Sequence, residues 1–193
     1  MNNDQALYAL QQEMEHDESL PLRESNLVFG EGDSHAEVVC IGEAPGAEED
    51  RLQRPFVGRS GKLLTACLLE IGWSRDRVYI TNIVKRRPPQ NRDPFPEEIQ
   101  AYAPYLSRQL AIIHPKVIVT LGRFSMNYFI PYGKITRDQG KIFRVRGMLV
   151  VPLFHPAAAL RSTTTLEAFK KSIKILPRVV AQADTLSLGS PIS

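Results

Sequence analysis

The feature that most constrains the fold of this chain is its alternation of short apolar runs with longer segments of helical spacing. The apolar runs, rich in β-branched residues, indicate buried strands at residues 36–41, 78–84, 117–122 and 148–154, with a shorter strand at 27–29. Helical spacing of apolar residues indicates helices at 4–16, 61–71, 94–114, 124–129 and 165–181. Strands that alternate with long helices form mostly parallel sheets covered on both faces. The sequence therefore predicts an α/β fold, a three-layer α/β/α sandwich with a central, mostly parallel four-stranded sheet.

The predicted topology also places the ligand site. In open parallel sheets, ligands bind outside the carboxyl ends of the strands. Three predicted strands run into residues 42–50, 82–92 and 155–161, which we therefore expect to form the site. Arg146 and Gly147 are expected to form the turn of a hairpin that leads into the last strand. Pro104 and Pro177 are expected to bend the helices that contain them.

Length and composition are those of one ordinary globular domain. The chain has 193 residues and a net charge of +3, a weak indication of an anionic partner, and it has no apolar run of about 18 residues that would span a membrane. The start MNNDQALYAL lacks the pattern of a signal peptide. We expect a single domain over residues 1–193 with a frayed tail from about 184, no membrane partner, and a cytoplasmic location. Cys40 and Cys67, without CxxC spacing, are expected to be buried reduced thiols.

The segment GEAPGAEED, residues 42–50, follows a predicted strand, and its glycines allow a ligand to approach the backbone closely. It does not match the GxGxxG phosphate loop, and GRSGKLL has Leu63 where a P-loop needs Ser or Thr. A metal site made of Glu43, Glu48, Glu49 and Asp50 lacks histidine or distant carboxylate partners at recognisable spacing. An acidic surface turn is an equal alternative to a binding site.

Three further residues stand where chemistry is expected. Pro156 suits the first position of a helix, so His155 would be the N-cap, where the helix dipole keeps it a neutral N–H donor to an oxyanion. A loop histidine satisfied by local backbone is the alternative. Asn82 ends a predicted strand with an amide that offers both a donor and an acceptor. Phe56, in the loop RPFVG, either packs in the core or stacks on a base.

The basic stretch NIVKRRPPQNRDP, residues 82–94, is either a solvated linker or a rigid surface for a polyanion. Together with the other segments it resembles the uracil-DNA glycosylase superfamily, most closely its family 4. The resemblance runs from VFGEG through GEAPGAEED, RPFVGRSGKLL, VYITNIVKRRPPQNRDP and PEEI to FHPAAALR. It implies a monomeric, monofunctional DNA glycosylase of bacterial or archaeal type. Such an enzyme flips uracil out of single- or double-stranded DNA and hydrolyses the N-glycosidic bond, leaving an abasic site for base excision repair.

The resemblance also implies roles for individual residues. The catalytic residues would be His155, as a donor to uracil O2, and Glu43 or Glu49, as help for the attacking water. The base would be surrounded by Gly42, Glu43, Ala44, Glu49, Phe56, Asn82 and His155, with Phe56 stacking on it and Asn82 reading its Watson–Crick edge. The DNA backbone would be contacted by Arg59, Ser60, Lys85, Arg86, Arg87, Asn91, Arg92 and Arg161.

One departure from the family concerns its cofactor. Family 4 enzymes carry four cysteines for an iron–sulfur cluster, two near the N-terminus, one after the lysine of TNIVK and one early in the next helix. Here HDESLPLRES contains none, Arg86 follows Lys85, and Tyr102 takes the approximate helix position. We therefore expect no cofactor and no metal site. Packing of Tyr102 with Leu20 and Leu22 is the expected substitute.

Two other functions stay open. A non-catalytic or covalently trapping uracil-DNA binder would accord with the lost cluster and with Ala44, where family 1 enzymes have a water-orienting aspartate. A hydrolase of small phosphorylated or acyl substrates could use Glu49 and His155. The chain lacks a nucleophile motif such as GxSxG, and this alternative explains neither the basic loop nor Phe56.

Overall fold

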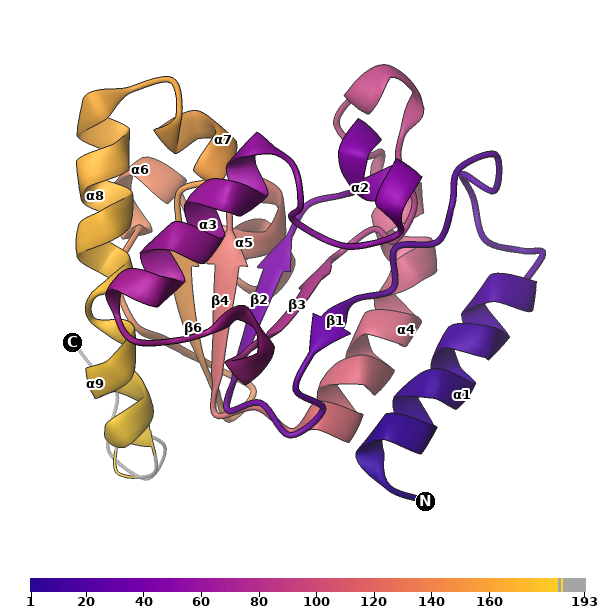
Figure 1. The fold of residues 1–193 in the computed structure, drawn as a ribbon, viewed down its shortest axis with the longest axis horizontal. Coiled ribbons are helices and arrows are strands. Elements are labelled where there is room, and N and C mark those ends of the chain that lie inside the picture. The colour runs from indigo at the N-terminus through magenta and orange to yellow at the C-terminus, as the bar shows by residue number, and fades with distance from the viewer. Residues whose placement is uncertain (184, 186–193) are drawn as a thin grey trace.

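The computed structural model describes residues 1–183 and 185, and the strands among them form one sheet (Figure 1). Their order across the sheet is β1-β3-β2-β4-β6-β5. The strands are β1 (Glu31–Gly32), β2 (Val38–Gly42), β3 (Tyr79–Asn82), β4 (Val117–Leu121), β5 (Phe143–Val145) and β6 (Met148–Leu153). β2 pairs in parallel with β3 and β4, and β4 with β6, whereas β1 and β5 are antiparallel edges. The tail expected from residue 184 falls outside the described residues, except for residue 185.

The predicted four parallel strands are the centre of this sheet, but the predicted strand number is too low because the described chain adds two short edge strands. The strand predicted at 27–29 is also wrong. There the N–H of Val28 donates to Lys85 O at 2.8 Å, and regular pairing with β3 begins only at Glu31. Gly32 permits this pairing, because its φ is +124° and an added Cβ would lie 1.9 Å from Val78 O.

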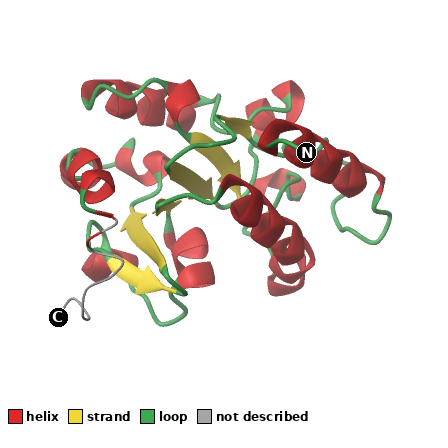
Figure 2. Cartoon of the chain, turned by 90° about the horizontal axis from the view of Figure 1, so that it is seen from below, coloured by secondary structure: helices red, strands yellow, loops and turns green. Residues whose placement is uncertain are grey.

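Helices cover both faces of the sheet, as Figure 2 shows. They are α1 (Asn3–His16), α2 (Ala47–Leu52), α3 (Arg59–Glu70), α4 (Pro96–Ile113), α5 (Arg123–Phe129), α6 (Ile135–Asp138), α7 (Pro156–Ala159), α8 (Thr163–Ile173) and α9 (Leu176–Ala181), with 3₁₀ turns η1 (Arg75–Arg77) and η2 (Pro89–Asn91). α3, α8 and α9 pack on one face, and α1, α4 and α5 pack on the other. The three-layer α/β/α architecture predicted from the sequence is therefore confirmed.

The prolines affect the helices differently. α4 begins at Pro96 and continues through Pro104 to its end, so the helix is not interrupted there. The single helix predicted for 165–181 is instead two helices, α8 and α9. Pro177 lies in the first turn of α9, the part of a helix that tolerates a residue without an N–H. The hairpin between β5 and β6 turns at Arg146 and Gly147 as predicted.

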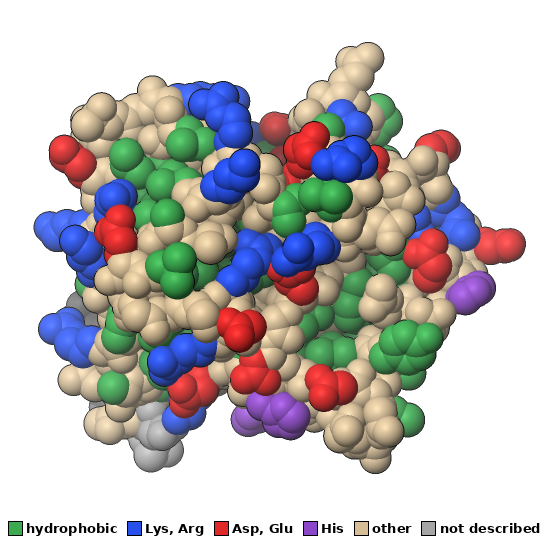
Figure 3. All heavy atoms as spheres, in the orientation of Figure 1, with side chains coloured by type: hydrophobic (Ala, Val, Ile, Leu, Met, Phe, Trp, Pro, Cys, Tyr) green, Lys and Arg blue, Asp and Glu red, His purple; other side chains and the backbone are tan. Residues whose placement is uncertain are grey.

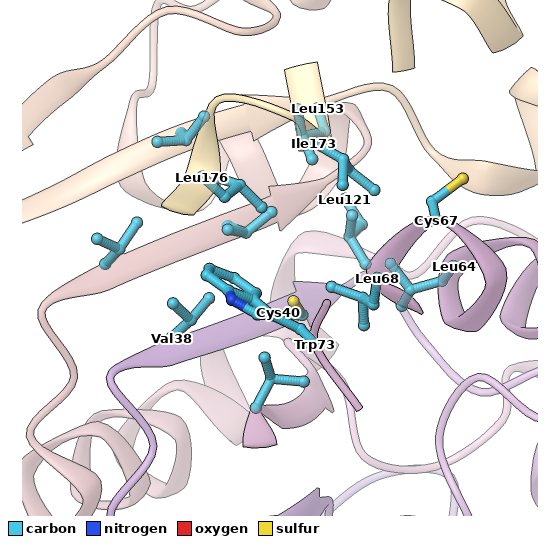
Figure 4. Packing of buried hydrophobic residues seen from close by; sticks show 14 of the residues in the cluster. Val38, Cys40, Leu64, Cys67, Leu68, Trp73, Leu121, Leu153, Ile173 and Leu176 are labelled. Carbon is cyan, nitrogen blue, oxygen red and sulfur yellow. The ribbon is translucent and has the colours of Figure 1, made fainter. Parts of the chain in front are cut away.

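Alternate residues of the central strands point into two separate cores. Cys40 of β2 faces the layer of α3, α8 and α9, whereas its neighbours Val39 and Ile41 face α1 and α4. Figure 4 shows the first core around Trp73, with Cys40 on a strand and Cys67 on a helix, well apart. Both cysteines are free and 1% exposed, as expected, and burial raises the pKa of Cys40 to about 12. They are therefore packing residues.

Candidate active site

In Figure 1 the arrows of the parallel strands point upward, toward α2, α7 and the loop that carries η2. A cavity of about 550 Å³ lies among them. Its lining consists of Glu43, Ala44, Pro45, Gly46, Glu49, Phe56, Ser60, Asn82, Pro88, Asn91, Arg92, Asp93, Gly122, Arg123, Phe124, His155, Ala157, Ala158 and Arg161. The three segments selected from the sequence, 42–50, 82–92 and 155–161, thus meet in one site. Figure 3 shows the molecule hollowed at this edge, with Lys and Arg side chains beside the hollow.

Asn82, the last residue of β3, forms part of the cavity wall and is 2% exposed. Its Oδ1 atom is buried and has no hydrogen-bond partner. Buried polar atoms are nearly always paired, so this acceptor is available to a ligand. Gly42, at the end of β2, lies against the Asn82 side chain, and its lack of a Cβ leaves space for the amide oxygen. A Cβ on Gly42 would lie 2.4 Å from Asn82 Oδ1 and 2.5 Å from Phe56 Cζ.

Phe56 belongs to the first core and to the cavity wall at the same time. The loop that carries it is held tightly, because Arg75 Nη1 donates to Phe56 O at 2.8 Å. Gly61 of α3 lies so close that an added Cβ would be 1.8 Å from the same oxygen. The centroid of the Phe56 ring is 5.8 Å from that of His155. The two interpretations of Phe56, core residue and binding residue, are therefore compatible.

His155 is the N-cap of α7, as predicted. Its Nδ1 accepts from the N–H of Ala157 at 3.1 Å, so Nδ1 carries no proton and the ring proton is on Nε2. Burial lowers the pKa of His155 to about 4; the charge of Glu49 opposes this effect, and the smaller effect of Arg161 adds to it. The neutral N–H donor predicted from the sequence is thus present, and burial is the largest cause of its lowered pKa.

The two glutamates proposed for the water step have different surroundings. Glu49 lies in α2, a helix that the sequence did not predict, and its Oε1 accepts from the N–H groups of Val57 at 3.0 Å and Gly58 at 2.8 Å. It therefore ties α2 to the loop of Phe56. Glu43 lies in the cavity wall, and burial, then the charge of Asp93, raise its pKa to about 7. Glu43 is thus partly protonated near neutral pH.

Basic and polar residues border the cavity where DNA contacts are expected. Arg59, Ser60 and Arg161 line a smaller hollow beside it. On the opposite side, Arg87 donates from Nε to Asn91 Oδ1 at 2.6 Å. A further candidate, Arg92, is bound to Glu98 by two hydrogen bonds of 2.8 and 2.6 Å and stacks on Phe95, so it mainly braces the loop.

The structure corrects the expectation for Lys85 and Arg86, which are 0% and 3% exposed and cannot reach a DNA backbone in this conformation. Lys85 Nζ donates to Thr81 Oγ1 at 2.6 Å and to Gln109 Oε1 at 2.5 Å. Arg86 donates to Glu15 Oε2 at 3.0 Å. Both side chains turn into the layer formed by α1 and α4, so the basic stretch reaches the surface only from Arg87 onward.

Two further lining residues lie outside the motifs used above. Arg123 and Phe124 begin α5, immediately after the carboxyl end of β4. Arg123 pairs with Asp93 at 3.0 Å and its guanidinium lies 4.2 Å from the centre of the Phe124 ring. The signal that finds them is the rule already used for the other strands, because β4 also ends at this edge.

The residues do not fit the iron–sulfur cluster that the family resemblance implies. In the part of the chain that the structure describes, no group of three or more His, Cys, Asp or Glu residues could hold a metal ion. Two positions where thiolates would be expected are occupied by Arg86 and Tyr102, whose side chains are buried and hydrogen bonded to Glu15 and to Pro21 O. A guanidinium and a phenol do not replace thiolates as cluster ligands. Among residues 1–183 and 185, no helix is both long and apolar enough to cross a membrane.

Most of the chain is similar to known proteins. The family profile of the Uracil DNA glycosylase superfamily matches residues 29–176. The chain is similar to the Type-4 uracil-DNA glycosylase of Sulfurisphaera tokodaii, with 47% identity over 160 residues, which cover 78% of this chain and 73% of that protein. It has 44% identity over 159 residues to the Type-4 uracil-DNA glycosylase of Archaeoglobus fulgidus, covering 78% and 80% of the two chains. It has 47% identity over 146 residues to the Type-4 uracil-DNA glycosylase of Thermotoga maritima, covering 74% of this chain and 76% of that protein.

Proposed function

Because the chain belongs to the uracil-DNA glycosylase superfamily and is a DNA glycosylase, we propose that it excises uracil from DNA by hydrolysing the N-glycosidic bond, leaving an abasic site for base excision repair. The observation that carries this proposal is the unpaired Oδ1 of Asn82 in the cavity wall. An amide offers one acceptor and one donor side by side, and the N3–H and O4 of uracil complement them. Cytosine reverses both groups, and a site built around such bonds discriminates by roughly 10⁴-fold.

The walls of the cavity suit a flat base. Phe56 supplies an aromatic face next to Asn82, on which the flipped base would stack. Glu49, fixed by the N–H groups of Val57 and Gly58, would crowd C5 and help to exclude the methyl group of thymine. A methyl clash contributes less selectivity than an unpaired hydrogen-bonding edge, so we expect thymine to be excluded less strictly than cytosine.

His155 would stabilise the leaving base. As the glycosidic bond breaks, negative charge develops on uracil O2, and the neutral Nε2–H of His155 donates to this oxygen. The bond from the Ala157 N–H to Nδ1 fixes both the ring and its tautomer, so the donor is preorganised. Removing one such donor typically slows catalysis by about 10²- to 10³-fold.

Glu43 is our choice for the group that takes the proton of the attacking water. Its pKa of about 7 is suited to proton transfer near neutral pH, and it lines the cavity. Glu49 is less suited because its Oε1 already accepts two backbone hydrogen bonds. The neighbouring Ala44 offers no alternative base.

The DNA backbone would run over both sides of the cavity. Arg59, Ser60 and Arg161 lie on one side, and Arg87 with Asn91 on the other. Contacts of this kind position the duplex without reading its sequence. They would also contribute to the few kcal/mol, roughly, that base flipping costs.

The direct test uses purified protein and oligonucleotides that carry uracil, cytosine or thymine at one position, single-stranded and paired. Free uracil should be released over many turnovers. Release that stops at one base per protein molecule would support a trapping binder instead, and no release at all would refute the proposal. The exposed, remote substitution Tyr132→Ser serves as a control for handling, since Tyr132 is 94% exposed and lies outside the cavity lining.

A further inference from the structure

We propose that Arg86 is a positioning residue, whose buried guanidinium fastens residues 17–27 to the loop after β3, and that these residues in turn hold α2 and its Glu49 in place at the cavity. The inference rests on the proposed function only for the part that Glu49 plays in the cavity wall. It reassigns Arg86 from a DNA contact to the interior scaffold of the site.

The Arg86 side chain joins parts of the chain that are far apart in sequence. Its Nη1 donates to Ser25 O, and its Nη2 donates to Glu15 Oε2 of α1 at 3.0 Å. The side chain is 3% exposed, and its Nε is buried without a partner. An arginine stays charged at all ordinary pH values, so its burial requires the compensating contacts with Glu15 and Ser25. The guanidinium is thus committed to the interior.

Other side chains hold the same stretch, residues 17–27, which forms neither helix nor strand. From α4, the hydroxyl of Tyr102 donates to Pro21 O at 2.7 Å, and that of Tyr105 donates to Asp17 Oδ2 at 2.6 Å. Ser25 Oγ donates to the carbonyl next to Arg86 in sequence, that of Arg87, at 2.6 Å. Without regular backbone pairing, the path of these residues depends on such side-chain contacts.

The far end of the stretch reaches the cavity wall. The N–H of Asn26 donates to Asp50 Oδ1 at 2.8 Å, and Asn26 Nδ2 donates to Asp50 O at 3.1 Å. Asp50 directly follows Glu49, the carboxylate that holds the loop of Phe56. A continuous chain of contacts therefore runs from Arg86 to the wall of the proposed uracil site.

These contacts connect the same elements that the iron ligands of family 4 would connect. Arg86 and Tyr102 stand at two of the expected cysteine positions, and residues 17–27 largely coincide with the stretch expected to carry the other two. A buried cation and two tyrosine hydroxyls here link α1, α4 and the loop after β3. These hydrogen bonds need no metal ion, so we expect the cavity wall to keep its position in protein that contains no iron.

The test compares Arg86→Met, which keeps an apolar stem, with Arg86→Lys, which keeps the charge. Arg108→Met is the matched control. Arg108 also forms an ion pair with α1, through Glu13, but both side chains are about half exposed and neither lies in residues 17–27. The readout is amide hydrogen exchange at Asn26 and at the two amides that Glu49 holds, with the amides of β4 as an internal reference.

In Arg86→Met, exchange at Asn26, Val57 and Gly58 should rise about tenfold over the β4 amides, as expected for the loss of the charged hydrogen bond that Arg86 donates to Ser25 O. Arg86→Lys should be intermediate, and Arg108→Met should resemble the unmodified protein. No change at these amides, or an equal rise in β4, would overturn the proposal.

Asp50→Ala tests the same path at its other end, should Arg86→Met fail to fold. Exchange at Val57 and Gly58 should again rise about tenfold. Single-turnover uracil excision should slow about tenfold while affinity for undamaged DNA stays the same. Unchanged exchange at Val57 and Gly58 would overturn the proposed series of contacts from Arg86 to Glu49. An unchanged excision rate would overturn the positioning role of these contacts.

Iron analysis of the purified protein completes the test. Iron well below one atom per chain is expected, and stoichiometric iron would overturn the inference. Exchange and iron content are both measured without uracil release, so their outcome is independent of whether the proposed function holds.

Discussion

Replacing Glu43 by glutamine separates the catalytic use of this carboxyl group from its effect on stability. Burial, reinforced by Asp93 and opposed by Arg123, raises the pKa of Glu43 from 4.5 to about 7. A carboxyl group whose pKa is higher in the folded chain contributes its full stability below about pH 4.5, and this stability is lost as the pH rises through about 7. Ionised Glu43 therefore destabilises the protein at alkaline pH, and glutamine at this position does not.

The structure sets the size of the effect. A pKa rise from 4.5 to about 7 corresponds to at most ~3 kcal/mol at pH 8, because a tenfold change in proton affinity is worth ~1.4 kcal/mol. Glu43 keeps part of its surface in the open cavity, and solvent screening lowers this figure to ~1–2 kcal/mol. We expect Glu43→Gln to be more stable than the unmodified protein by that amount at pH 8, and the two to be within ~0.3 kcal/mol at pH 4.

Urea unfolding at pH 4, 6 and 8, followed through the fluorescence of Trp73, measures this difference, since Trp73 is the chain's single tryptophan and is 4% exposed. Protonation of His155 near pH 4 affects both proteins and cancels in the comparison. Uracil release by the unmodified protein should rise with pH around 7 and lose this dependence in Glu43→Gln. A stability difference that is the same at all three pH values would refute the reasoning.

Three further predictions concern the other residues of the site. His155→Ala should slow single-turnover excision by about 10²- to 10³-fold with DNA affinity retained, and a normal rate would remove His155 from the mechanism. Asn82→Ala should reduce the preference for uracil over cytosine by about tenfold or more, measured as the ratio of kcat/KM values, whereas full selectivity would contradict its reading role. Arg161→Ala should lower the slope of log DNA affinity against log salt concentration by about 1, and Lys85→Met should leave this slope unchanged. Equal slopes for the two variants would contradict the proposal that Arg161 faces the DNA and Lys85 lies in the interior.

Local patterns were sufficient to predict the parallel strands and most helices, because hydrophobic periodicity is a property of short stretches. The rule on strand ends then selected loops that do meet in one cavity. The same rule reaches Arg123 after β4, although no motif marks it. α2 escapes prediction because a short, acidic segment with no buried residues carries no periodic signal. The edge strands β1 and β5 are short, and their pairing depends on neighbours distant in sequence.

The sequence by itself determined the α/β architecture, the family, and the candidate positions Asn82 and His155, since all of these follow from spacing and motif. Only the tertiary structure decided which basic residues of NIVKRRPPQNRDP reach solvent. The buried side chain of Arg86 donates a hydrogen bond to a glutamate 71 positions away in the sequence, and that of Lys85 donates to a glutamine 24 positions away. The pKa values of His155 and Glu43 likewise depend on burial by several separate elements. Burial is a property of the packed chain, so no local pattern in the sequence specifies it.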